Sequence, residues 1–169
     1  WLKVARRTAP NSSDSSRRPS AEDSPVASDD LTFATLPEPL AREAQSLWNR
    51  FLERRPPEET LAIPKHVADS LPLILASSPF IAHEITRDVR LFKRLLDEAW
   101  LEQCRDDRDI SAVLKEAVAR VADETGLQKA LRTIRNLEMV RIAWRDIAGW
   151  ASVEETLLDL SLLAEAAVD

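Results

Sequence analysis

Apolar residues recur along most of this chain at steps of three and four, the spacing that places them on one face of an α-helix. The clearest stripe lies within residues 131–150 and consists of Leu137, Val140, Trp144 and Ile147. It predicts a helix over about residues 127–148, which Gly149 can end because glycine tolerates the left-handed conformation. Other apolar residues lie beside the charged positions of this helix, so we expect neighbouring elements on more than one of its sides.

The arc opposite that stripe is charged and contains Arg135, Glu138, Arg141 and Arg145. Two interpretations stay open. In the first, these residues form the charged outer edge of a core helix. In the second, Arg141 and Arg145 face a carboxylate or a phosphate across a domain boundary, because like charges four residues apart repel unless an anion lies nearby.

Upstream, helical spacing alternates with prolines that end or interrupt helices. One helix is predicted over residues 40–52, with Trp48 and Phe51 in the core and a proline pair stopping it. A second helix that begins near Pro64 would be kinked or split by Pro72.

Ser78 and Pro79 predict the next helix start, as an N-cap followed by a first-turn proline. Helical spacing then continues to about Cys104, and the pattern leaves undecided whether the chain bends within residues 86–88. A further helix is expected over residues 110–124, ending near Gly126.

A capping box of Ser152 and Glu155 predicts the start of the last helix. Its apolar stripe consists of Val153, Leu157, Leu160, Ala164 and Val168. This face and that of the preceding helix are wide, so we expect them to pack on something besides each other.

These elements predict an all-α fold, an irregular bundle of six to seven helices over residues 33–169, after a disordered tail over residues 1–32. The tail is predicted because Ser, Asp, Arg and Pro dominate it, and such a composition cannot repay the entropy of ordering. The low content of glycine, 2 residues in 169, agrees with a helical class.

Composition excludes several classes of protein. A net charge of -6 argues against a nucleic-acid-binding protein, which needs a positive surface. The longest apolar run, residues 71–82, is too short for a membrane span and contains prolines. The single Cys104 fits a reducing cytoplasm, and residues 1–10 show no signal-peptide pattern.

Two features suggest chemistry but have simpler explanations. Asp107 and Asp109 form a D-x-D pair, which on a strand could hold Mg²⁺, but here they lie between helical patterns, where Asp109 fits an N-cap. The glycine-rich turn that brings a nucleotide close to the backbone is absent from the sequence, whose only glycines are Gly126 and Gly149. His66 and His83 lie near no candidate nucleophile and are expected at the surface or the edge of the core.

The region from residue 131 to residue 168 resembles a known family almost continuously. The motif residues are Arg132, Arg135, Glu138, Met139, Arg141, Ile142, Trp144, Arg145 and Asp146, followed by Glu154 to Leu157 and Leu160 to Glu165. They are similar to the N-terminal half of the bifunctional glutamine synthetase adenylyltransferase/adenylyl-removing enzyme. Residues 78–82 and 87–96 resemble the preceding helices of that family more loosely, and nothing before Phe33 does.

The resemblance implies an enzyme of nitrogen metabolism that attaches AMP to glutamine synthetase and removes it, under control of the PII signalling protein. It implies two nucleotidyltransferase domains that use ATP and Mg²⁺, held by a glycine-rich turn and a D-x-D pair. The residues seen here match the helical segment before the first of these domains, so the fragment is expected to need no cofactor and to be inactive alone. The motif residues Arg135, Glu138, Arg141, Trp144, Arg145 and Asp146 are candidates for contacts with that absent domain or with an anion.

The chain begins with Trp1, its only methionine is Met139, and its last helix is unfinished at Asp169. We therefore expect a piece of a longer reading frame. The alternative is a stand-alone helical module that binds another protein through its C-terminal apolar face and has no enzymatic activity.

Overall fold

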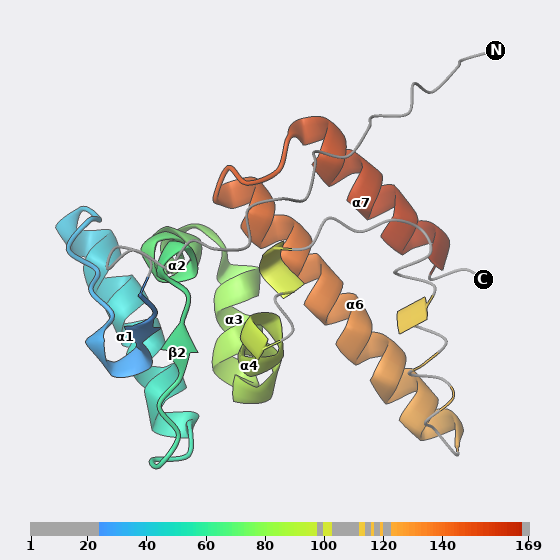
Figure 1. Ribbon diagram of the computed structural model, residues 1–169, viewed down its shortest axis with the longest axis horizontal. Coiled ribbons are helices and arrows are strands. Elements are labelled where there is room, and N and C mark those ends of the chain that lie inside the picture. The colour runs from blue at the N-terminus through green and yellow to red at the C-terminus, as the bar shows by residue number, and fades with distance from the viewer. Residues whose placement is uncertain are drawn as a thin grey trace, which may run out of the picture.

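The computed structural model describes residues 24–97, 100–102, 112–113, 116, 119 and 123–166. Within these ranges it contains six α-helices and one two-stranded sheet, which confirms the all-α prediction. The helices are α1 (Glu38–Arg54), α2 (Lys65–Ser77), α3 (Pro79–Arg87), α4 (Val89–Asp97), α6 (Glu124–Ile147) and α7 (Val153–Ala166). Figure 1 shows α1 to α4 on one side of the long helix α6, with α7 folding back along α6.

The end of α1 and the start of α3 lie where local sequence signals place them. Helix α1 ends just before the proline pair, and the Ser78 hydroxyl accepts a hydrogen bond from the Ile81 backbone N–H at 3.2 Å, which caps α3. Helix α2 is not split at Pro72, because its apolar side chains on either side of the proline are buried in the core. The bend that the sequence left undecided occurs at Asp88, whose extended backbone separates α3 from α4.

Helix α6 starts earlier than predicted, and Gly126 does not end a preceding helix. Asp123 caps α6, since its carboxylate accepts a hydrogen bond from the Gly126 N–H at 2.7 Å, so Gly126 lies in the first turn. At the other end Gly149 has φ +71°, as predicted for the residue that terminates this helix. The predicted helix over residues 110–124, Cys104 and the Asp107–Asp109 pair lie almost wholly outside the described residues.

The described secondary structure begins before Phe33. Strand β1 (Val26–Ala27) pairs antiparallel with β2 (Ala62–Ile63), and the 3-10 helix η2 (Ser28–Asp30) follows β1. Ser28 is buried: its carbonyl accepts from the Trp48 indole N–H at 3.0 Å, and its hydroxyl accepts from Arg55 Nη1 at 3.1 Å. Residues 26–31 therefore belong with the helical domain, although their polar composition placed them in the tail.

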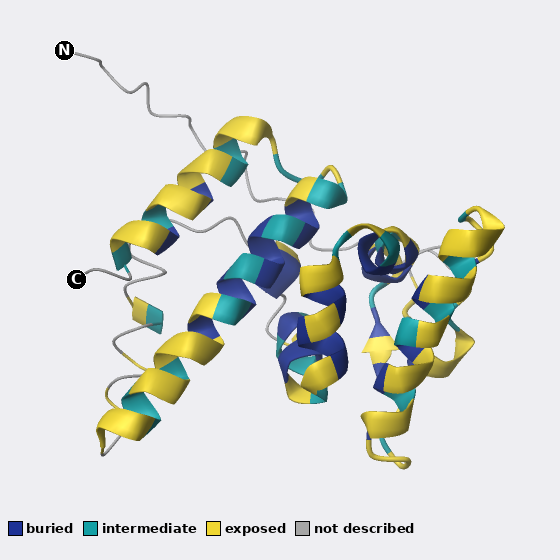
Figure 2. Cartoon of the chain, turned by 180° about the vertical axis from the view of Figure 1, so that it is seen from behind, coloured by how far each residue is buried: buried dark blue, intermediate teal, exposed yellow. Residues whose placement is uncertain are grey.

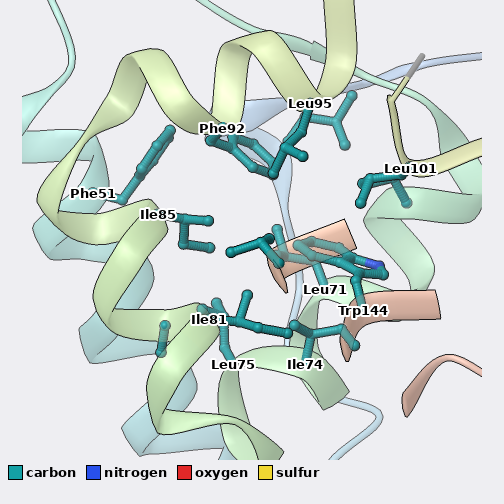
Figure 3. Close-up of a cluster of buried hydrophobic side chains, with 14 of the residues drawn as sticks. Phe51, Leu71, Ile74, Leu75, Ile81, Ile85, Phe92, Leu95, Leu101 and Trp144 are labelled. Atoms are coloured by element: carbon teal, nitrogen blue, oxygen red, sulfur yellow. The ribbon is translucent and has the colours of Figure 1, made fainter. Parts of the chain in front are cut away.

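The core joins the helices through a chain of aromatic rings. Trp48 and Phe51, both buried as predicted, stack at 4.5 Å between centroids, and Phe51 meets the edge of Phe92 on α4 at 5.3 Å. Phe92 in turn stacks on Trp144 of α6 at 6.2 Å. Figure 3 shows Phe92 and Trp144 among the aliphatic side chains that surround them. This cluster fixes α6 against α1 to α4 and leaves its opposite side for α7.

Candidate functional site

Most of the charged arc of α6 is buried, although Arg135 is exposed. Glu138 and Arg141 are 1% and 0% exposed, and Arg145 is 8% exposed. The first interpretation, a charged outer edge, is therefore wrong for these three residues. The reason is that α7 folds back over this side of α6 and that the 3-10 helix η3 (Trp100–Glu102) packs beside it. Figure 2 shows buried residues along the middle of α6.

Arg141 lies at the centre of a network of charged side chains. Its Nε donates to Glu138 Oε2 at 2.8 Å, and its Nη2 lies 2.8 Å from Asp159 Oδ2 on α7. The other oxygen of Glu138 accepts from the Trp100 indole N–H of η3 at 3.1 Å. The buried guanidinium thus joins α6 to α7 directly, and through Glu138 it is connected to η3.

Arg145 makes a parallel set of contacts one helical turn further on. Its Nη1 donates to the Leu101 carbonyl of η3 at 3.0 Å, and its Nη2 donates to Glu155 Oε1 of α7 at 2.6 Å. Each of the two arginines therefore contacts a carboxylate of α7. Arg145 also contacts η3 directly, and Arg141 is connected to η3 through Glu138.

The network shows which anions compensate the like charges of Arg141 and Arg145. Arg141 and Arg145 are like charges four residues apart on one helix, and three carboxylates compensate them, those of Glu138, Glu155 and Asp159. These anions belong to the chain itself. A contact of the same arginines with a phosphate or with another domain stays a prediction.

The remaining candidate residues divide between core and surface. Trp144 is fully buried and donates its indole N–H to the Ser70 hydroxyl at 3.0 Å. Arg135 is exposed, and Asp146 is exposed and accepts from the Thr156 hydroxyl at 3.2 Å. The structure thus brings Glu138, Arg141 and Arg145 together and leaves Arg135 outside their network.

Sequence reasoning missed the partners Trp100, Glu155 and Asp159. A signal for the last two was present. Glu155 and Asp159 are four residues apart, as are Arg145 and Arg141, so two antiparallel helices joined by a short turn place each arginine opposite one carboxylate. The position of Trp100 carried no comparable signal, because a long segment separates it from α6.

The described residues contain no group of three or more His, Cys, Asp or Glu side chains arranged to hold a metal ion. His66 is partly exposed, pairs with Glu102 at 3.1 Å and packs against Trp150, and His83 is exposed, so both lie at the surface or core edge as expected. No helix within these residues combines the length and the apolarity needed to cross a membrane.

The fold and the buried network define a helical domain in which charged residues hold helices together. Comparison with known proteins then identifies its family. The family model for glutamate-ammonia ligase adenylyltransferase matches residues 68–169, and the chain belongs to this family. The matched region runs from α2 to the end of the chain and includes every residue of the network.

Individual relatives agree with that assignment. Proteins described as bifunctional glutamine synthetase adenylyltransferase/adenylyl-removing enzyme are similar to this chain. The one from Shewanella loihica is 31% identical over 83% of the chain and 14% of its own length. Those from Shewanella oneidensis and Pseudomonas aeruginosa are 41% and 32% identical over 58% and 64% of the chain, and 10% and 11% of their own lengths. The chain therefore spans about a seventh or less of these relatives. No solved structure is significantly similar to it.

Proposed function

We propose that this chain is the helical N-terminal part of the enzyme that adenylylates and deadenylylates glutamine synthetase in nitrogen regulation. The observation that carries the proposal is the family match over residues 68–169, together with the coincidence of the motif residues and the buried network. In this proposal, Arg141 and Arg145 fix α7 and η3 on α6.

In this proposal the chain is not itself the catalyst. The sequence lacks the glycine-rich turn that a nucleotidyltransferase needs beside its carboxylate pair, since Gly126 lies in a helix start and Gly149 in a helix end. ATP and Mg²⁺ are bound by other domains of the whole enzyme. Its protein partners, glutamine synthetase and PII, and its cytoplasmic location are likewise properties of that whole enzyme.

The role of the domain is to position the catalytic domain that follows it. A rigid pair of helices suits this role, and the ion pairs of Arg141 and Arg145 make α6 and α7 such a pair. Of the motif residues, Arg135 and Asp146 are exposed and are available for direct contact with the neighbouring domain. The buried residues Glu138, Trp144, Arg141 and Arg145 would act indirectly, by fixing the helix that carries Arg135 and Asp146.

The test is a pair of assays with purified glutamine synthetase. Transfer of labelled AMP from ATP, and its phosphate-dependent release, are measured with the 169-residue chain and with the longer enzyme that contains it. We expect no reaction with the short chain and both reactions with the enzyme. The Arg141→Ala variant of the enzyme should lose most of both activities, whereas Arg42→Ala, at an exposed ion pair of α1, should keep them.

A longer enzyme that carries these residues but does not modify glutamine synthetase would overturn the proposal. The alternative function, a helical module that binds another protein, is favoured by the exposed leucines of α7. It predicts that the short chain captures a protein partner and that the same capture continues when no catalytic domain is attached.

A further inference from the structure

Helix α7 turns an apolar stripe away from the rest of the molecule. Val153, Leu157 and Leu160 are 68%, 59% and 38% exposed, and Ala164 is exposed as well. Figure 2 shows the outer side of α7 coloured as exposed along most of its length. An amphipathic helix on the surface of a globular protein normally buries its apolar side and exposes its polar residues, so α7 has the reverse arrangement.

The inner side of α7 explains how this arrangement is stable. Helix α7 is held on α6 by the ion pairs of Glu155 and Asp159, and among its leucines Leu163 is the buried one. The docking of α7 therefore does not use the stripe. The four positions of the stripe therefore remain for another contact, as does Leu158, which is 57% exposed.

The spacing of the stripe indicates what shape of partner fits it. Residues 153, 157, 160 and 164 follow steps of four, three and four, the a and d positions of a heptad repeat. Such a row packs against a second helix that crosses at a shallow angle, and the small side chain of Ala164 permits close approach. A row with this spacing matches a second helix better than it matches a flat sheet or a small ligand.

The charges beside the stripe indicate the chemistry of that helix. On a helical projection, Glu154 and Glu165 lie along the edge of the stripe that is turned away from α6, and both are exposed. Lysine or arginine beside the apolar face of the partner would complement them. A second copy of this chain would instead bring its own glutamates to the same edge, and each copy has a net charge of -6.

We infer that the outer stripe of α7 is the docking surface for an amphipathic helix with Lys or Arg beside its apolar face, supplied by another part of the same enzyme chain. This inference rests on the proposed function. The relatives extend far beyond the matched region, which covers 14% of the Shewanella loihica enzyme. A helix tethered in the same polypeptide has a high effective concentration at this surface, and so needs only a modest contact area to bind.

The experiment measures the accessibility of the stripe in the longer enzyme. Leu157→Cys is compared with Leu73→Cys on α2, and labelling by a maleimide is followed at each site by mass spectrometry. In the structure Leu157 is 59% exposed and Leu73 is 44% exposed, so without a partner the two sites label at similar rates. With the helix docked, we expect L157C to react at least about tenfold more slowly than L73C.

Two further measurements identify the occupant. Protection of L157C by a helix of the same chain does not change on dilution, and it decreases when Glu154 and Glu165 are both replaced by Lys. Equal labelling of the two sites overturns the inference. Protection that disappears on dilution also overturns it and assigns the surface to a second copy of the chain. Protection that the charge reversal does not change overturns the inference that the docked helix carries Lys or Arg at this edge. AMP transfer by the same enzyme samples reports separately on the proposed function.

Discussion

At the scale of single residues, Arg141 is the most unusual feature of this protein. A guanidinium that is 0% exposed has lost its hydration, and the interior repays that cost only through well-placed partners. Glu138 and Asp159 supply them at 2.8 Å each. An apolar residue could fill the same volume without this cost. The ion pairs form in only one register of the two helices, so the charges specify the position of α7 on α6.

Replacing Arg141 by Ala leaves the carboxylates of Glu138 and Asp159 buried without their cation. We expect a loss of about 3–5 kcal/mol in the free energy of unfolding, the usual cost of breaking a buried ion pair from one side. The measurement is urea denaturation followed by circular dichroism.

A matched control is available in α1. Arg42 pairs with Glu38 at 3.6 Å, and both side chains are at least 75% exposed. Arg42→Ala should change the free energy of unfolding by less than about 1 kcal/mol, because exposed ion pairs contribute little. Similar losses in the two variants would show that the buried network is not what holds α7.

At the scale of elements, the start of α7 depends on Ser152. Its hydroxyl oxygen accepts from the Glu155 N–H at 3.2 Å, which is the N-cap half of the predicted capping box, and the Glu155 side chain pairs with Arg145. The pKa of Glu154 is lowered from 4.5, first by a hydrogen bond from its own backbone N–H and then by one from Ser152. The cap thus joins helix initiation, the ion-pair network and a carboxylate beside the outer stripe.

Ser152→Ala should remove the cap and destabilise the fold at neutral pH by about 1 kcal/mol. It should also raise the pKa of Glu154 toward 4.5, which a carbon-13 NMR titration of that carboxyl measures. A carboxyl whose pKa is lower in the folded state stabilises the fold above its unfolded pKa and loses this effect as the pH falls through the folded value. The part of the deficit due to Glu154 should therefore disappear in acid.

The control for the cap is Ser161→Ala. Ser161 lies in the interior of α7, where its hydroxyl donates to the Leu157 carbonyl at 2.9 Å, and alanine has the higher helix propensity. This variant should leave both the stability and the pKa of Glu154 nearly unchanged. An unchanged Glu154 pKa in the Ser152→Ala variant would contradict the role assigned to the cap.

At the scale of the whole molecule, one aromatic cluster joins the two sides of the bundle. Trp48 and Phe51 of α1, Phe92 of α4 and Trp144 of α6 are in continuous ring contact. A second link is Glu84 of α3, whose carboxylate accepts from the Asn136 side chain of α6 at 2.7 Å. Helices α1 to α4 and α6 therefore share one core.

A shared core predicts a single cooperative unfolding transition. Near-ultraviolet circular dichroism, which reports on the aromatic packing, and far-ultraviolet dichroism, which reports on the helices, should give the same midpoint. Phe92→Ala should shift both signals together and cost about 3–5 kcal/mol, because it opens a cavity at the centre of the cluster. Two separate midpoints would instead show that α1 to α4 unfold independently of α6.

The sequence alone determined the class of fold, several helix boundaries and the family. A proline pair, a Ser-Pro cap and a glycine with positive φ act on the residues next to them, so they could be recognised without knowing the fold. The core positions of Trp48 and Phe51 followed from spacing along one helix. The motif around Arg141 and Arg145 pointed to the family, which the comparison confirmed.

Only the tertiary structure decided what surrounds those arginines. Glu155 and Asp159 reach them because α7 folds back on α6, and Trp100 reaches Glu138 across 38 residues of sequence. Likewise, strand β1 pairs with a partner more than thirty residues away, which no local composition indicates. Periodicity shows which residues share a face of a helix, but whether that face is buried, and by which charges, depends on the element that packs against it.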